Sequence, residues 1–246
     1  MIDLIDECSY DFERLGYKKV KAKKYDIDLL SLHVDSDKES KETGFDMGDY
    51  FIINAPLLQY LDEECFDYVS MLFEKRLKFL IKKWHVKKSK TLLVGLGNPE
   101  IWADRFGVEV CRQFALDKFS NVKKFCPNVY FETGLATFEV VKALVEKFDI
   151  TFIIVLDALC TNHISRLGCS IQLTTTGMTP GSGVIFGNKR ICKKELGVPC
   201  FSIGVPFMIN SRSLGAEEEL LLCPKDVKEN VQNLGYIISH ALEGAL

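Results

Sequence analysis

The 246-residue sequence lacks a basic surplus, a long apolar run and any internal repeat. Its 31 lysines and arginines face 34 acidic residues, which gives a formal net charge of −3. Proteins that neutralise nucleic-acid phosphates usually carry the opposite imbalance, so we expect no direct nucleic-acid partner. No stretch reaches the roughly 18 apolar residues of a membrane span, and the N-terminus lacks the basic and apolar regions of a signal peptide. We therefore expect a cytoplasmic protein with no membrane partner.

Histidine and cysteine motifs are also scarce. The sequence has no H-E-x-x-H motif, and its four histidines are dispersed: His33, His85, His163 and His240. A hydrolytic zinc site is not expected, and we predict no other metal or cofactor. The nine cysteines include no C-x-x-C pair and are scattered through apolar stretches, a pattern that favours free, buried thiols. Ser182 lies in G-S-G rather than G-x-S-x-G, which argues against a serine-hydrolase nucleophile.

The hydropathy pattern predicts an α/β fold. Residues 18–35 are typical of an edge strand or hairpin, and residues 35–43 of a charged loop. Helices are predicted over residues 61–84, 107–119, 137–148 and 224–241, and strands over residues 49–55, 91–96, 150–156, 170–174, 201–205 and around Val129. This alternation indicates a mostly parallel sheet with helices on both faces. We predict a single domain over residues 1–246, in which an N-terminal strand region, 1–60, packs on a core formed by 61–246.

Two aspartates follow predicted strands of this sheet. Asp157 ends the apolar run Thr-Phe-Ile-Ile-Val-Leu, and Asp104 lies in the loop that leaves the strand over residues 91–96. Ligands gather where the carboxyl ends of parallel strands meet, so the two carboxylates can approach each other. Two close carboxyl groups do not both ionise readily, and one can keep its proton while the other acts as a base toward water. An aspartate after a strand also commonly caps a helix, and this alternative stays open.

Glycine-rich segments give a second signal. Gly97 and Asn98 follow the strand over residues 91–96, in a G-x-G that lacks the third glycine of the dinucleotide fingerprint. The run from Thr174 to Gly183 combines hydroxyls with flexible backbone, which suits the binding of a peptide or an oxyanion. A long loop without a ligand explains that run equally well. Lys189 and Arg190 could neutralise an acidic substrate, or could be a solvated surface pair.

These segments resemble the germination proteases, a family of aspartic-type endopeptidases that act on small acid-soluble spore proteins. The matches occur in the same order along nearly the whole chain. Gly95-Leu-Gly-Asn with Asp104 and Gly107 resembles G-L-G-N-W-x-V-T-P-D-A-L-G, Leu156-Asp-Ala-Leu resembles I-D-A-L, Thr176-Gly with Pro180-Gly-Ser-Gly-Val and Gly187-Asn-Lys-Arg resembles T-G-I-H-P-G-S-G-V-G-N-K-R, Ile203-Gly-Val-Pro resembles I-G-V-P, and Pro224-Lys-Asp-Val resembles P-K-E-V.

The resemblance implies a function and a site. It implies a phosphorylase/hydrolase-like fold and an endopeptidase of the spore core, which forms tetramers and cleaves small acid-soluble spore proteins during germination. Asp104 and Asp157 then take the positions of the two functional aspartates. The residues expected to bind substrate are Gly97, Asn98, Thr176, Gly177, Pro180, Gly181, Ser182, Gly183, Lys189 and Arg190. Because the sequence begins like the family's mature enzyme, we also expect no propeptide.

Several departures keep other functions open. Pro99-Glu-Ile-Trp-Ala replaces the W-x-V-T-P stretch, Thr179 replaces a usual histidine, and residues 211–222 form a shorter segment than in the family. These changes favour, as one alternative, a non-catalytic binding homologue. Another is a hydrogenase-maturation-like endopeptidase, since Trp102-Ala-Asp-Arg-Phe-Gly-Val faintly resembles W-A-D-E-G-F-G-V.

Overall fold

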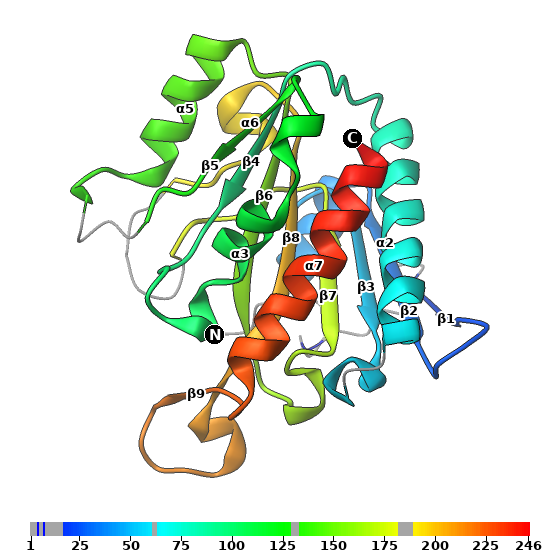
Figure 1. Ribbon diagram of the computed structural model, residues 1–246. Coiled ribbons are helices and arrows are strands. Elements are labelled where there is room, and N and C mark those ends of the chain that lie inside the picture. The colour runs from blue at the N-terminus through cyan, green and yellow to red at the C-terminus, as the bar shows by residue number, and fades with distance from the viewer. Residues whose placement is uncertain (1–3, 5–6, 8–16, 61–62, 129–132, 182–188) are drawn as a thin grey trace.

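The strands of the chain form one mixed sheet. The computed structural model describes residues 4, 7, 17–60, 63–128, 133–181 and 189–246. The strands within these residues are β1 (Lys18–Lys21), β2 (Asp28–Val34), β3 (Gly48–Asn54), β4 (Thr91–Gly95), β5 (Val122–Phe125), β6 (Phe152–Thr161), β7 (Ser170–Thr174), β8 (Cys200–Asn210) and β9 (Leu221–Leu222). Their order is β1-β2-β3-β7-β8-β6-β4-β5, and β9 pairs with β8 (Figure 1). Strands β8, β6, β4 and β5 are parallel, whereas β7, β3, β2 and β1 extend the sheet in antiparallel fashion.

Helices cover both faces of the parallel part. The longer helices are α2 (Glu63–Lys83), α3 (Phe106–Gln113), α5 (Thr137–Phe148) and α7 (Val227–Ala245), and α6 (Lys193–Leu196) and α1 (Asp37–Thr43) are short. Buried side chains of α2, α3 and α7 share one core cluster, and those of α5 belong to a second cluster on the opposite face. Short 3-10 turns also occur: η3 (Pro56–Tyr60), η4 (Trp102–Asp104), η5 (Leu116–Lys118), η6 (Ile164–Arg166) and η7 (Ser211–Leu214). The predicted α/β class with helices on both faces is confirmed.

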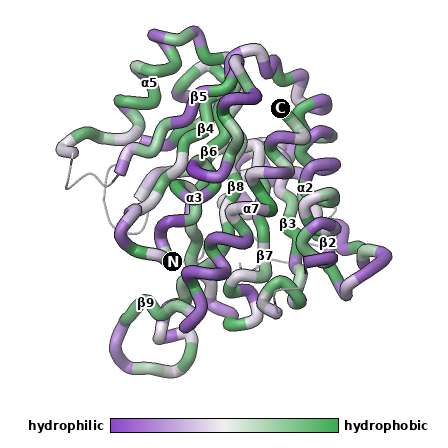
Figure 2. Tube along the Cα trace, in the orientation of Figure 1, coloured by the Kyte–Doolittle hydropathy of each residue, from purple (hydrophilic) through white to green (hydrophobic). Residues whose placement is uncertain are grey.

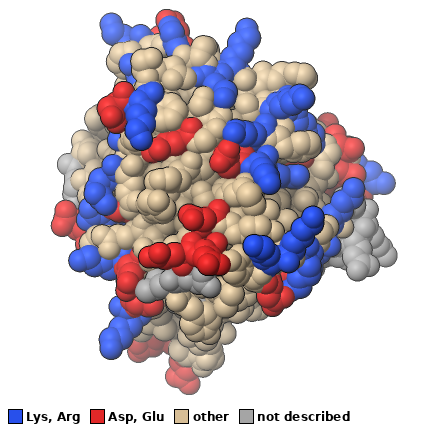
Figure 3. All heavy atoms as spheres, turned by 45° about the vertical axis from the view of Figure 1, so that its right-hand side comes forward, with Lys and Arg blue, Asp and Glu red and all other residues tan. Residues whose placement is uncertain are grey.

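The central strands are apolar because both of their faces are buried. In β6, Ile154 and Leu156 enter the first cluster, and Ile153 and Val155 enter the second. Figure 2 shows the same predominance of apolar residues along β4, β6 and β8. Outside this core, basic and acidic side chains are interspersed on the face that Figure 3 shows.

Several element boundaries differ from the sequence prediction. The strand that was expected to end before Asp157 continues to Thr161, since its pairing with β8 continues beyond Asp157. The helix predicted over residues 107–119 ends at Gln113, and the chain then forms strand β5 at Val122–Phe125. The strand expected around Val129 falls on residues 129–132, which the structure does not describe. The C-terminal helix α7 begins at Val227 and reaches Ala245.

The charged loop predicted over residues 35–43 is wrong, because Asp37–Thr43 forms helix α1. Ser36 caps the helix by accepting the Glu39 backbone N–H at 3.2 Å, and the Glu39 carboxylate accepts the Asp35 N–H at 3.0 Å. Gly44 ends the helix in the left-handed conformation. The capping serine, the glutamate three residues later and the terminal glycine are the signals that the charge run concealed.

Two predicted elements and the state of the cysteines agree with the structure. The N-terminal hairpin is present as the β1-β2 pair, and helix α2 matches the segment predicted over residues 61–84. None of the eight cysteines within the described residues is in a disulfide, and five of them are buried. In the same residues, no helix has both the length and the apolar character that crossing a bilayer requires.

Candidate active site

Three glycines bring the loop after β4 into close contact with α3 and β6. A Cβ atom at Gly97, whose φ is +108°, would overlap the backbone carbonyl of Asp104. A Cβ at Gly107 would overlap the Leu156 carbonyl, and one at Gly95 would lie 2.9 Å from the Cys111 sulfur. Only glycine permits these approaches. The glycines therefore fix where the loop places Asp104.

Asp104 is the last residue of η4 and is half-buried against this loop. Its Oδ2 accepts the backbone N–H of Asn98 at 2.7 Å. Burial raises the pKa of the Asp104 carboxyl above its usual value, and the Asn98 hydrogen bond opposes part of that rise. The environment thus favours the neutral, proton-bearing form more than water does.

Asp157 lies within β6, where it interrupts an otherwise buried strand. Its Oδ1 accepts the N–H of Ala158 at 2.9 Å, and its register partner on β8 is Gly204. By strand alternation its side chain lies on the same face of the sheet as Val155, the face that α5 covers. Sequence reasoning placed this aspartate at a strand end, whereas the strand continues four residues beyond it.

Asp104 and Asp157 belong to different elements, but both lie near the carboxyl end of β4. The N–H of Leu96 donates to the Leu156 carbonyl at 2.8 Å, directly before Asp157, while Gly97 packs against Asp104. The carboxyl end of β4 therefore lies between them. Ala103, directly before Asp104, packs in the core cluster on the α3 side and anchors this part of the loop.

Comparison with known proteins adds the family. A family model described as germination protease matches residues 6–218 of the chain. The chain belongs to the germination protease family. The germination protease of Geobacillus sp. (strain WCH70) is 32% identical over 210 residues, which cover 78% of this chain and 56% of the relative. That of Bacillus subtilis (strain 168) is 30% identical over 201 residues, covering 75% and 54%. The chain thus spans little more than half the length of these germination proteases.

A solved structure is more distantly similar. It is a [NiFe] hydrogenase maturation protease, HycI, from Thermococcus kodakarensis KOD1, and it is 17% identical to this chain. The similarity covers 63% of this chain and 93% of that protein, with a TM-score of 0.39.

In this germination protease family member, Arg105 holds the loop that carries Asp104. Its Nη1 donates to the Pro99 carbonyl at 3.0 Å, and its guanidinium stacks 4.6 Å from the centroid of the Trp102 ring. Lys228 of α7 approaches that ring at 5.2 Å. Sequence reasoning gave Arg105 and Trp102 no role in holding the loop. The only signal was that both lie in or next to the stretch that departs from the family pattern.

The residues expected to bind substrate divide into two groups. Gly97 and Asn98 lie beside Asp104. Thr176, Lys189 and Arg190 instead line a pocket at the amino end of β8. Gly177 adjoins them, because the Arg190 Nη2 donates to its carbonyl at 3.0 Å.

The remaining predicted binding residues follow Gly177 in the chain. Met178 and Ile191 form an isolated β-bridge, after which Pro180 is buried and Gly181 is exposed with a φ of +60°. Ser182 and Gly183 lie outside the described residues. Among the residues that are described, no group of three histidine, cysteine, aspartate or glutamate side chains is placed to hold a metal ion.

Proposed function

We propose that this chain is an endopeptidase in which Asp104 and Asp157 activate water for attack on a peptide bond. The observation that carries the proposal is the placement of Asp104. It is half-buried against Gly97, its pKa is raised, and it lies at the edge of β4 next to the strand that holds Asp157. Membership of the germination protease family supports the same reaction class.

The two carboxyl groups take different roles in this proposal. Asp104 takes the role of the acid, because burial raises its pKa and so favours its proton-bearing form more than water does. Asp157 acts as the base and accepts a proton from water, whose oxygen attacks the carbonyl carbon of the scissile bond. Asp104 donates its proton to the carbonyl oxygen, which gives a tetrahedral intermediate with two hydroxyl groups. As this intermediate collapses, the proton on Asp157 passes to the leaving amine and one hydroxyl proton returns to Asp104.

The proposed substrates are small acid-soluble spore proteins, cleaved during germination in the spore core. The names of the curated relatives support a role in germination. We further propose that the chain works as a homo-oligomer, a tetramer by analogy with the resembled family. Gly97 and Asn98 would contact the substrate backbone next to Asp104.

The test compares wild type with Asp104→Asn and Asp157→Asn, each incubated with an α/β-type small acid-soluble spore protein and analysed by mass spectrometry. We expect each variant to lose roughly 100-fold or more in cleavage rate, the usual contribution of general acid or base catalysis. Asp149→Asn is the matched control, because Asp149 caps α5 and its side chain is 82% exposed.

The outcomes separate the alternatives. Full cleavage by Asp157→Asn would rule out the two-carboxylate mechanism. A folded wild-type protein that binds the substrate without cutting it would contradict the enzyme proposal and favour a non-catalytic binding homologue. Equal losses in Asp149→Asn would mean that the assay reports general damage from the substitution.

A further inference from the structure

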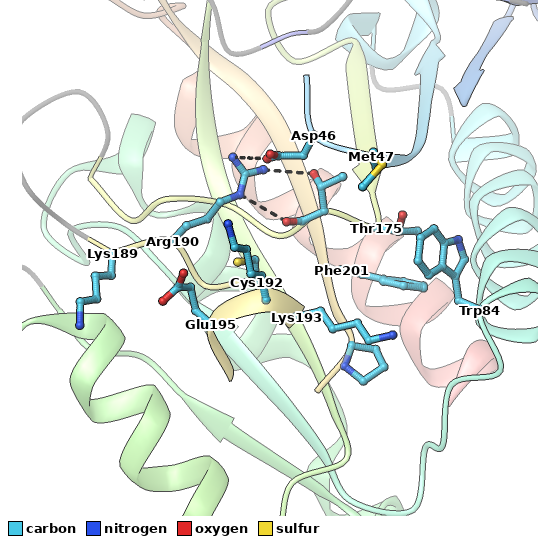
Figure 4. Close-up of a pocket in the computed structure, with 13 residues that line it drawn as sticks. Asp46, Met47, Trp84, Thr175, Lys189, Arg190, Cys192, Lys193, Glu195 and Phe201 are labelled. Atoms are coloured by element: carbon cyan, nitrogen blue, oxygen red, sulfur yellow. Dashed lines mark hydrogen bonds and ion pairs between the residues drawn. The ribbon is translucent and has the colours of Figure 1, made fainter. Parts of the chain in front are cut away.

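A pocket of about 840 Å³ opens near the amino end of β8, apart from the two aspartates. Its walls come from the end of α2, the segment after β7, the start of β8 and helix α6 (Figure 4). Phe201 lines it, whereas the register partner of Asp157 is Gly204, three residues farther along the strand, or roughly 10 Å. The volume lies in the range of small-molecule sites.

One part of the pocket is a fixed polar frame around Arg190. Its Nη1 lies 2.9 Å from the Asp46 carboxylate, and its Nη2 donates to the Thr176 hydroxyl at 3.1 Å and to the Gly177 carbonyl at 3.0 Å. Arg190 is therefore neutralised by Asp46 and held in place. It shapes the wall of the pocket but does not offer a free guanidinium fork to a ligand.

The uncompensated charge lies on α6 and beside it. Four cationic and two acidic side chains line the pocket, which leaves two positive charges in excess: Lys189, Arg190, Lys193 and Lys194 against Asp46 and Glu195. Lys189 approaches Glu139 only loosely, at 3.7 Å. Within the described residues, Lys193 and Lys194 have no ion-pair partner. In Figure 4, Lys193 extends toward the side of the pocket where Trp84 and Phe201 lie.

The other part of the pocket is aromatic and well ordered by its neighbours. The Trp84 indole N–H donates to the Asp49 Oδ2 at 2.6 Å, and Asp49 also binds the Lys83 ammonium at 2.7 Å. Thr175 accepts the Asp49 backbone N–H at 2.9 Å, which leaves its hydroxyl proton available to a ligand. Phe201 is buried in the core next to this wall.

We propose that this pocket binds a phosphomonoester carried on an aromatic ring system, such as a nucleoside monophosphate. Lysine ammonium groups act as point charges that suit phosphate, and the one arginine fork is already occupied by Asp46. Trp84 and Met47 supply an apolar surface for the ring, and the buried Phe201 lies behind them in the core. This assignment is independent of the peptidase proposal, and it differs from the role in binding polypeptide that the family resemblance implies for Arg190.

The test is isothermal titration calorimetry at low ionic strength with adenosine 5′-monophosphate, adenosine and inorganic phosphate. The main variant is Lys193→Gln/Lys194→Gln, whose side chains are exposed and not part of the core. The matched control is Lys142→Gln/Lys147→Gln on α5, also exposed. We expect the monophosphate to bind wild type and the control more tightly than either fragment does. Removing both ammonium groups should weaken that binding roughly tenfold.

Each other outcome contradicts the proposal. No binding of the monophosphate to wild type, or equal binding by the main variant and the control, would overturn the site. If adenosine binds as tightly as the monophosphate, the phosphate group has no role in binding. If inorganic phosphate binds as tightly as the monophosphate, the ring has no role in binding. Since no residue of the candidate active site is changed, cleavage by the main variant is measured separately and tests only the peptidase proposal.

Discussion

At the scale of single residues, Gly97 has the most demanding environment in the loop after β4. It combines a φ of +108° with direct contact between its Cα and the Asp104 backbone. Any side chain must strain the backbone and also push Asp104 away from the Asn98 N–H. The position of the Asp104 carboxyl therefore requires that residue 97 has no side chain.

We predict that Gly97→Ala lowers the free energy of unfolding by about 3 kcal/mol, the sum of left-handed strain and overpacking. It should also abolish peptide cleavage, because Asp104 moves with its carbonyl. Chemical denaturation and the cleavage assay measure the two effects.

The control is Gly197→Ala, which has a similar left-handed φ of +73° but no atom within 4 Å of the added Cβ. It should cost only about 1 kcal/mol and leave cleavage intact. Equal effects of the two substitutions would show that contact with Asp104 is unimportant.

At the scale of elements, the hydrogen bonds of Glu109 help to hold α3 against α7. Its side chain is 1% exposed and accepts from Arg112 at 2.6–3.1 Å and from Gln113 at 2.7 Å. Gln113 in turn donates to the Gln232 carbonyl of α7 at 2.9 Å. Burial alone would raise the pKa of Glu109, but the Arg112 and Gln113 hydrogen bonds outweigh it and lower the pKa.

We predict that Glu109→Gln lowers the free energy of unfolding by about 2 kcal/mol at pH 7, because a buried charged acceptor is lost. Because its folded pKa is lowered, the stabilisation from Glu109 is present above the unfolded pKa and disappears as the pH falls through the folded value. Denaturation at pH 7 and at pH 3 measures this difference. Glu146→Gln, at an exposed position on α5, is the control and should leave the free energy of unfolding unchanged. A Glu109 variant as stable as that control would contradict the role of Glu109.

The elements that could be predicted from sequence are those whose pattern reports burial directly. Examples are the helical spacing of apolar residues in α2 and the apolar run Phe152–Leu156 at the start of β6. The end of β6 could not be predicted, because an aspartate inside a strand has the same local signal as one that ends it. Only the pairing of Asp157 with Gly204 on β8 distinguishes the two.

At the scale of the whole molecule, the sequence indicated Asp104 and Asp157 from their places after predicted strands. It could not indicate the pocket, whose aromatic wall depends on contacts between distant segments. Asp49 joins Trp84, 35 residues away, to Thr175, 126 residues away. No local sequence pattern predicts contacts between segments so far apart. The family resemblance instead grouped Arg190 with the substrate-binding residues beside Asp104, which lie at the other edge of the sheet.

The response of global stability to pH gives a last prediction. Asp104 and Glu109 have opposite pKa shifts, so they act in opposite directions. Since the folded pKa of Asp104 is raised, the folded state binds this proton more tightly. That contribution is fully present below the unfolded pKa and is lost as the pH rises through the folded value. Ionisation of Asp104 therefore weakens the fold, and this cost is complete above the folded pKa.

Asp104→Asn should consequently be more stable than wild type at pH 7 while losing cleavage, because the amide oxygen can still accept the Asn98 N–H without carrying a buried charge. At pH 3, where wild-type Asp104 is protonated, the two proteins should unfold at the same temperature. Thermal unfolding of both across this pH range measures the difference, with Asp149→Asn as the exposed control. A variant that is less stable at pH 7 would mean that the ionised carboxylate holds the loop, and would count against Asp104 as the proton donor.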